Sequence, residues 1–244
     1  MKHKNKREYE KKKKCSCSQK SFDYHGKENA LIGKKGNFNV KSVVVVKMLL
    51  TDEEKETTRK NTLEQMKQIQ TKELKQLEEW TTLKCSDIVF DSNVDNWAQD
   101  TSVFNERIIG KKQLVFLIED EDGEKFGYYL NTELVEKYYE KIKTDNKSFE
   151  FNLESNGRLQ HPMKFEIKDL RCGGYWLYEK SDYRLIELGD IVLRKENNKK
   201  DSLCSQSENK FDYHGIKNAL SRKQPDEYGA MYFTPARILV IQMK

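Results

Sequence analysis

The fold is decided by residues 114–130, which read Leu114-Val115-Phe116-Leu117-Ile118-Glu119-Asp120-Glu121-Asp122-Gly123-Glu124-Lys125-Phe126-Gly127-Tyr128-Tyr129-Leu130. One continuous apolar run ends in an acidic turn, and a second apolar run follows the turn. An Asp-Gly pair between two such runs is the strongest short-range signal for a β-hairpin. The sequence therefore predicts two antiparallel strands joined at Asp122-Gly123.

Outward from this hairpin, short apolar or alternating segments predict further strands. They lie at residues 88–90, 149–153, 165–167, 175–178, 185–188, 191–193 and 238–243. Helical spacing appears in two short segments, 102–109 and 132–143. Many short consecutive strands with few helices are typical of a mainly antiparallel sheet fold. We therefore expect residues 81–244 to form an α+β, mainly β domain: a two-sheet β-sandwich with a few flanking helices.

Residues 51–80 precede this domain and contain no Gly or Pro. Thr51-x-x-Glu54 is a capping-box pattern, which marks the start of a helix. The apolar residues fall on one side at helical spacing: Leu63, Met66, Ile69, Leu74, Leu77 and Trp80. The sequence predicts one long amphipathic helix. Its stripe either packs on the following domain or pairs with a second copy of the chain.

The chain also contains a partial internal repeat. Phe22-Asp23-Tyr24-His25-Gly26 recurs as Phe211-Asp212-Tyr213-His214-Gly215, and residues 38–48 align with residues 233–243. Residues 15–48 are thus a partial copy of the chain's own C-terminal end, as expected for a truncated tandem module. The 38–48 segment either competes for a strand position or pairs with another molecule, or it is a relic of duplication.

Charge is unevenly distributed along the chain. The net charge is +5, but residues 1–20 hold nine basic and two acidic side chains, which leaves 36 basic and 38 acidic residues elsewhere. A slightly acidic body disfavours nucleic-acid binding, since such binding needs a basic structured face. We interpret residues 1–14 as a basic disordered tail. A nuclear-import or anionic-lipid patch is the alternative for this tail.

Composition narrows the cellular setting. Hydrophobic residues make up 36% of the chain, and no segment approaches the about 20 apolar residues of a membrane-spanning helix. The five cysteines, an odd number without a C-x-x-C pattern, favour free thiols in a reducing compartment. We therefore expect a cytoplasmic protein without a transmembrane segment. Peripheral membrane or nuclear presence stays open.

Residues 109–129, which run from Ile109-Gly110 through Asp122-Gly123 to Phe126-Gly127, resemble the signature hairpin of the TLDc domain family. Ser148-Phe149-Glu150-Phe151-Asn152-Leu153 resembles a further strand of that family, and Arg237-Ile238-Leu239-Val240-Ile241-Gln242 resembles its closing strand. The resemblance covers about residues 80–244. It is closest to the divergent, lysine-rich versions found in amoebic protists. The signature residues are Gly110, Asp122, Gly123, Phe126 and Gly127.

This resemblance implies a two-sheet β-sandwich and a non-catalytic interaction module. The family is linked to protection against oxidative damage and to binding of the vacuolar proton pump, so pump subunits are the implied partners. It implies no catalytic residues and no cofactor. An oligomerising scaffold, built through residues 51–80 or the 38–48 strand, is a further hypothesis.

Three side-chain groups are candidates for chemistry of their own. Cys204 and His214, with Asp212 orienting the imidazole, are the types needed for a nucleophile and its base, which is the alternative enzyme hypothesis. Cys15, Cys17 and His25 are zinc-ligand types, but they lack paired four-ligand spacing. The acidic run at 119–124 offers carboxylates for calcium, but lies between strands rather than helices. We expect no metal site and no cofactor.

Overall fold

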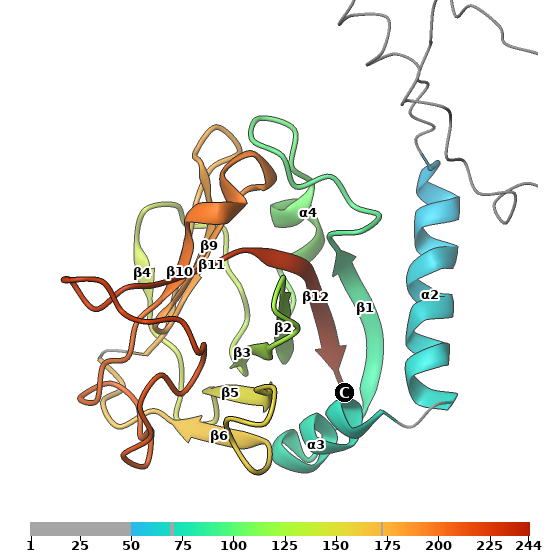
Figure 1. Cartoon of the computed structure of the whole chain (residues 1–244). Coiled ribbons are helices and arrows are strands. Elements are labelled where there is room, and N and C mark those ends of the chain that lie inside the picture. Colours follow the sequence, from blue (N-terminus) through green and yellow to red (C-terminus); the bar gives the residue numbers. More distant parts are fainter. Residues whose placement is uncertain (1–49, 69–70, 172) are drawn as a thin grey trace, which may run out of the picture. The chain divides into compact units, whose positions relative to one another are not determined.

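The computed structural model describes residues 50–68, 71–171 and 173–244. Within them the chain forms two six-stranded antiparallel sheets, as the sequence predicts (Figure 1). Sheet A has the order β1 (Cys85–Asp91), β12 (Pro235–Met243), β2 (Leu114–Asp120), β3 (Lys125–Leu130), β5 (Phe149–Glu154) and β6 (Met163–Glu166). Sheet B has the order β11 (Met231–Phe233), β10 (Ser202–Cys204), β9 (Ile191–Arg194), β8 (Arg184–Leu188), β7 (Tyr175–Leu177) and β4 (Lys141–Ile142).

The hairpin formed by β2 and β3 is confirmed. Its register runs from Leu114 opposite Leu130 to Glu119 opposite Lys125. Gly123 has φ +80, the left-handed conformation that a tight turn needs and that glycine adopts without strain. Gly127 is required for space, because a Cβ atom there would lie 1.8 Å from the carbonyl oxygen of Phe116. Two of the signature glycines therefore have direct steric reasons.

The last strand of the chain is an interior strand of sheet A. β12 pairs with β2 on one side and with β1 on the other, so the first and last strands of the domain lie side by side. Its apolar residues alternate between two cores: Ile238 and Val240 face sheet B, whereas Leu239 and Ile241 face away from it. The continuous apolar run of this strand is thus explained by burial on both faces.

The main core fills the space between the two sheets. Its side chains include Phe90, Phe116, Phe126, Ile186 and Leu193, all fully buried. A second core lies on the opposite face of sheet A, where Leu117, Phe151 and Ile241 pack against apolar side chains of the two N-terminal helices. Figure 1 shows these helices on the side of sheet A away from sheet B. The architecture therefore has three layers: helices, sheet A and sheet B.

The prediction of one continuous helix over residues 51–80 is wrong. The segment forms two helices, α2 (Asp52–Gln68) and α3 (Lys72–Thr81). The capping box is confirmed, since the Glu54 amide donates to the Thr51 hydroxyl at 3.2 Å and the Thr51 amide donates to the Glu54 carboxylate at 2.7 Å. The Thr71 hydroxyl then caps α3 by accepting from the Leu74 amide at 3.3 Å.

The physical reason for the break is burial. Leu63 of α2 and Leu74 and Leu77 of α3 are all buried in the second core. The change of direction between the helices, visible in Figure 1, keeps both apolar faces on the curved sheet. The stripe is thus used within the chain, as the packing interpretation predicts. Ile69 lies outside the described residues.

The predicted helix at residues 132–143 is also wrong. Its only regular element is the two-residue strand β4, which pairs with β7. Tyr138 forms an isolated bridge with Leu177, and the Tyr139 amide donates to the Leu177 carbonyl. The edge of β7 therefore takes up the backbone groups that a helix would have bonded internally. The predicted helix at 102–109 is confirmed as a single short one, α4 (Phe104–Ile108).

Several predictions lie outside the described residues. They are the 1–14 tail, the 15–48 copy with its 38–48 strand, and the cysteine and histidine residues Cys15, Cys17, His25 and Cys172. None of the helices in the described part of the chain has the length and apolar character of a membrane span.

Candidate functional site

The structure places Cys204 and His214 in different environments. Cys204 lies in β10 and is fully buried; its sulfur donates to the Met231 carbonyl at 3.8 Å. Burial raises the pKa of this thiol well above its ordinary value, with nearby carboxyl groups adding to the effect. His214 lies half-exposed and contacts Asp212, with 3.6 Å between Nδ1 and the carboxylate. A nucleophilic cysteine needs an accessible thiolate beside its base. This geometry does not supply one.

The repeated motif nevertheless has a structural task in its C-terminal copy. Phe211 and Tyr213 are fully buried in the main core, whereas Asp212 and His214 point outward. The Asp212 amide donates to the Glu166 carbonyl at 2.8 Å, which adds this segment to the free edge of β6. The alternation places the Tyr213 hydroxyl between the two sheets.

A carboxyl pair meets that hydroxyl in the protein interior. Glu150, on β5 of sheet A, accepts from Tyr213 at 2.6 Å and from the Asp190 amide at 2.6 Å. The Tyr213 hydroxyl also lies 3.0 Å from the carboxylate of Asp190, which stands between β8 and β9 of sheet B. Lys210 and Ser207 donate to Asp190 at 2.7 and 3.1 Å. We name these five residues the buried acid cluster.

Burial controls the electrostatics of the buried acid cluster. The pKa of Glu150 is raised well above its ordinary value, first by desolvation and then by the Asp190 charge. Desolvation also raises the pKa of the Tyr213 phenol. A protonated Glu150 can donate to Tyr213, which then donates to Asp190, so that each proton has an acceptor. The arrangement is a closed hydrogen-bond network that joins the two sheets and the 205–230 loop.

Glu150 and Asp190 were not predicted as site residues from the sequence. Phe149 and Phe151 mark one face of β5 as apolar, which suggested solvent on the other face. In the structure both faces of β5 are buried, and Asn152 on the polar face also donates to the Leu220 carbonyl at 2.8 Å. The available signal in the sequence was the recurrence of one tyrosine, as Tyr24 and Tyr213, in the two copies of the motif.

Carboxylates of the acidic turn at 119–124 form hydrogen bonds and ion pairs with other groups of the protein. Asp120 accepts from the amides of Asp122 and Glu124, at 3.0 and 2.9 Å. Asp122 forms an ion pair with Lys223, and Glu124 accepts from the Arg222 amide at 2.8 Å. These contacts hold the turn against the 205–230 loop. Among the described residues, no group of three or more His, Cys, Asp or Glu side chains is placed to hold a metal ion.

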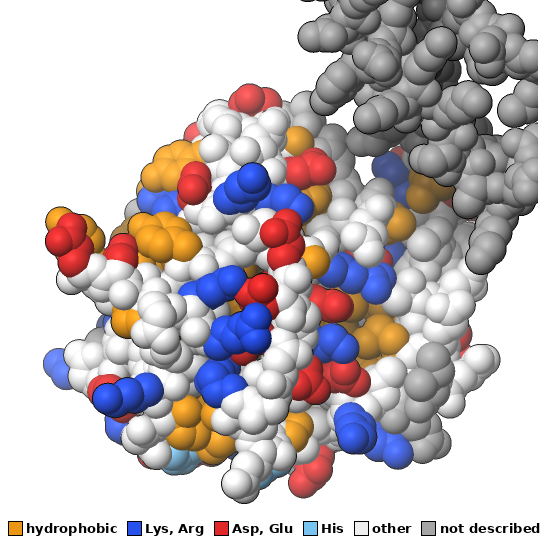
Figure 2. Space-filling view, in the orientation of Figure 1, with side chains coloured by type: hydrophobic (Ala, Val, Ile, Leu, Met, Phe, Trp, Pro, Cys, Tyr) orange, Lys and Arg blue, Asp and Glu red, His pale blue; other side chains and the backbone are white. Residues whose placement is uncertain are grey.

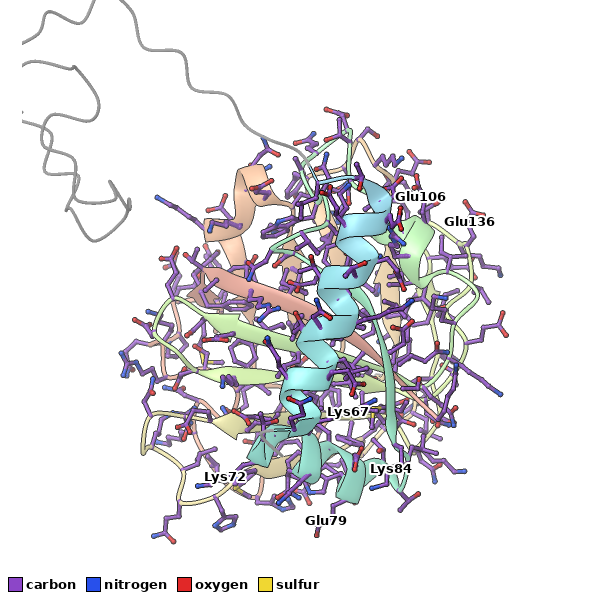
Figure 3. All side chains as sticks on the ribbon, turned by 90° about the vertical axis from the view of Figure 1, so that its right-hand side faces the viewer. Lys67, Lys72, Glu79, Lys84, Glu106 and Glu136 are labelled. Atoms are coloured by element: carbon purple, nitrogen blue, oxygen red, sulfur yellow. The ribbon has the colours of Figure 1, made fainter. Side chains whose placement is uncertain are left out.

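A surface hollow of about 370 Å³ lies at the C-terminal end of α3. Its walls come from α3 and the following turn, from β3 and from the β5–β6 pair of sheet A. The lining side chains are Trp80, Thr81, Thr82, Leu83, Gln113, Tyr129, Asn131, Asn146, Lys147, Phe149, Lys164 and Glu166. In Figure 3, Lys84 and Glu79 mark this end of α3. We call this feature the α3 hollow.

Aromatic rings form the base of the α3 hollow. Trp80 meets Phe149 edge-on with 6.1 Å between ring centroids, and Tyr129 lies 5.1 Å from the same ring. The Lys164 ammonium stands over the Phe149 ring at 5.3 Å and pairs with Glu166 at 2.8 Å. Rigid aromatic side chains beside cations are typical of recognition surfaces.

The outer face of sheet B is a second exposed feature. One row of cross-strand neighbours crosses the sheet: Lys141, Trp176, Glu187, Val192, Leu203 and Tyr232. Tyr232 is 48% exposed, and Val192 and Leu203 are half-buried. Beside this row, Arg184 stacks on Tyr178 at 3.9 Å and Arg194 on Tyr183 at 4.6 Å. This sheet keeps apolar side chains partly open to solvent.

Charges are mixed on the visible surface. Figure 2 shows Lys and Arg interspersed with Asp and Glu on one face of the molecule, without a single-sign field.

No protein-family model and no curated protein matches the chain.

Proposed function

We propose that the chain is a non-catalytic, TLDc-like interaction module that acts in oxidative-stress protection or in regulation of the vacuolar proton pump. The signature hairpin supports the family part of this proposal, because Gly123 and Gly127 occupy positions that need glycine. The confirmed two-sheet sandwich agrees with the family fold. The roles themselves come from the resemblance alone, since fold does not determine function.

The observation that carries the non-catalytic part is the placement of the reactive side chains. Cys204 is buried with a raised pKa, and its sulfur donates to the Met231 carbonyl. Glu150 and Asp190 are buried and already bonded to Tyr213, Lys210 and their own neighbours. The exposed features are instead aromatic and cationic surfaces, which suit protein recognition better than bond-making chemistry.

Affinity capture tests the proposal directly. The tagged full chain is used to capture partners from cells that express it, with and without oxidant, and a Gly127→Val variant is the misfolded control. We expect vacuolar proton-pump subunits to be recovered with the wild-type chain and not with the control. Their absence under both conditions would remove the pump from the proposal.

Self-association is the second candidate function, and the outer face of sheet B is the observation that favours it. An aromatic and arginine-rich face of this kind can pair with its own copy across a two-fold axis. The α2 and α3 stripe is less suited, since Leu63, Leu74 and Leu77 are already buried. Sedimentation of the full chain and of Tyr232→Lys tests the idea. A strict monomer at high concentration would eliminate it.

A further inference from the structure

We infer that the α3 hollow binds an acidic peptide segment of a partner protein, which inserts one apolar side chain beside Trp80 and Leu83 and places carboxylates near Lys147 and Lys164. This inference rests on the proposed function, because it assigns a partner chemistry to the interaction module. The shape, the aromatic base and the charge of the hollow each support it.

The size and rigidity of the hollow suit a short peptide segment that carries an apolar side chain. Its volume of about 370 Å³ lies within the range of ligand-binding clefts. Trp80 is half-buried and is held edge-on to Phe149, and it also lies 6.2 Å from Phe151. An aromatic wall that is already ordered loses little freedom on binding. Binding hot spots share this combination of an anchored tryptophan and a pocket.

Several polar groups of the hollow are donors. Among the described residues, no hydrogen bond engages the Lys147 ammonium, the Gln113 side-chain amide or the Trp80 indole N–H. Lys147 is exposed. Glu166 is the one carboxylate in the lining, and it already pairs with Lys164. The unengaged donors therefore complement a ligand rich in carboxylates, which would also be steered toward the two ammonium groups.

A defined peptide probe tests the inference. The full chain is titrated into a fluorescein-labelled peptide, Asp-Glu-Asp-Phe-Glu-Asp-Glu-Gly, and fluorescence anisotropy is measured at about 0.05 and 0.2 M salt. We expect saturable binding with a Kd of about 100 μM or tighter at the lower salt. A matched peptide with Ser in place of Phe should bind about tenfold more weakly, because it lacks the side chain that enters the hollow.

Charge-reversal variants locate the binding. Lys147→Glu and Lys164→Glu should each weaken the acidic peptide about tenfold, since an attraction becomes a repulsion. Lys200→Glu is the matched control: it makes the same charge change at an exposed lysine outside the lining and should alter binding less than about twofold. Equal loss in all three variants, equal binding of the two peptides, or no binding at all would each overturn the inference.

The two proposals fail in distinguishable ways. If a partner captured by the wild-type chain also binds Lys147→Glu undiminished, the hollow is not its site, whereas the interaction module stands. If the peptide binds through Lys147 but no cellular partner is captured, the hollow stands and the pump proposal falls. Binding to phosphatidylserine vesicles through Lys147, without peptide binding, would assign the hollow to a lipid surface and overturn the peptide inference.

Discussion

Replacing Glu150 with glutamine should remove a pH dependence from the stability of this protein. Glu150 is fully buried, and its folded-state pKa is raised well above the ordinary value of 4.5. Between these two pKa values the folded state holds a proton that the unfolded chain has released. The stability contributed by the protonated group is therefore fully present below pH 4.5 and is lost as the pH rises through the folded-state pKa.

The size of the effect follows from the proton count. Because the folded state binds one extra proton, each unit of rise in pH lowers the free energy of unfolding by about 1.4 kcal/mol. Glutamine imitates the protonated acid: its amide nitrogen can donate to Tyr213, and its oxygen can still accept from the Asp190 amide. We expect Glu150→Gln to match the stability of the wild type near pH 4. Above pH 4.5 the variant should become more stable than the wild type by about 1.4 kcal/mol per pH unit until the folded-state pKa is reached.

Urea unfolding followed by circular dichroism, at half-unit steps from pH 4 to pH 8, measures this gap. Glu154→Gln is the matched control, because Glu154 is the exposed residue at the end of the same strand. It shows what loss of one carboxyl does without burial. A constant difference between the wild type and Glu150→Gln across the pH range would refute the raised pKa and the proton chain through Tyr213.

Three further variants test the packing, and thermal or urea unfolding reads out each. Arg59→Ala should cost about 3–5 kcal/mol, since it removes the 2.7 Å partner of the buried Asp95 and leaves that charge poorly compensated; an unchanged midpoint would contradict this. Gly127→Ala should cost about 3 kcal/mol, because its Cβ would lie 1.8 Å from the Phe116 carbonyl oxygen; wild-type stability would disprove the close approach. Lys195→Met should cost about 2–3 kcal/mol, as the buried ammonium donates to three backbone carbonyls at 2.5–2.7 Å; Lys195→Arg is the charge-retaining comparison.

The candidate site was only partly predictable. The sequence singled out Cys204 and His214 by residue type, but a catalytic pair needs proximity and exposure, which residue type does not report. The buried acid cluster joins Glu150 to Asp190 and Tyr213 across sequence separations of 40 and 63 residues. The α3 hollow likewise joins Trp80 to residues of β5 and β6. Such sites arise only where distant segments pack together.

Local signals determined much of the secondary structure. Asp122-Gly123 specified the hairpin because a tight turn depends on the conformational freedom of its own residues. Thr51 and Glu54 specified the start of α2 for a similar reason, since both caps bond within one helical turn. Strand type and the two-sheet class followed from the spacing of apolar residues. These features need no knowledge of what lies nearby in space.

Tertiary packing decided what local pattern left open. Residues 132–143 have helical spacing, yet the free edge of β7 binds their backbone. α2 ends at Gln68 and Thr71 caps α3, which carries Leu74 into the second core. The position of β12 between β1 and β2, and the burial of Glu150 beside Asp190, were likewise set by distant partners. The physical reason is common to the 132–143 segment, β12 and Glu150. A backbone or carboxyl group leaves water only where another segment supplies its hydrogen bond, and that segment is known only once the chain has folded.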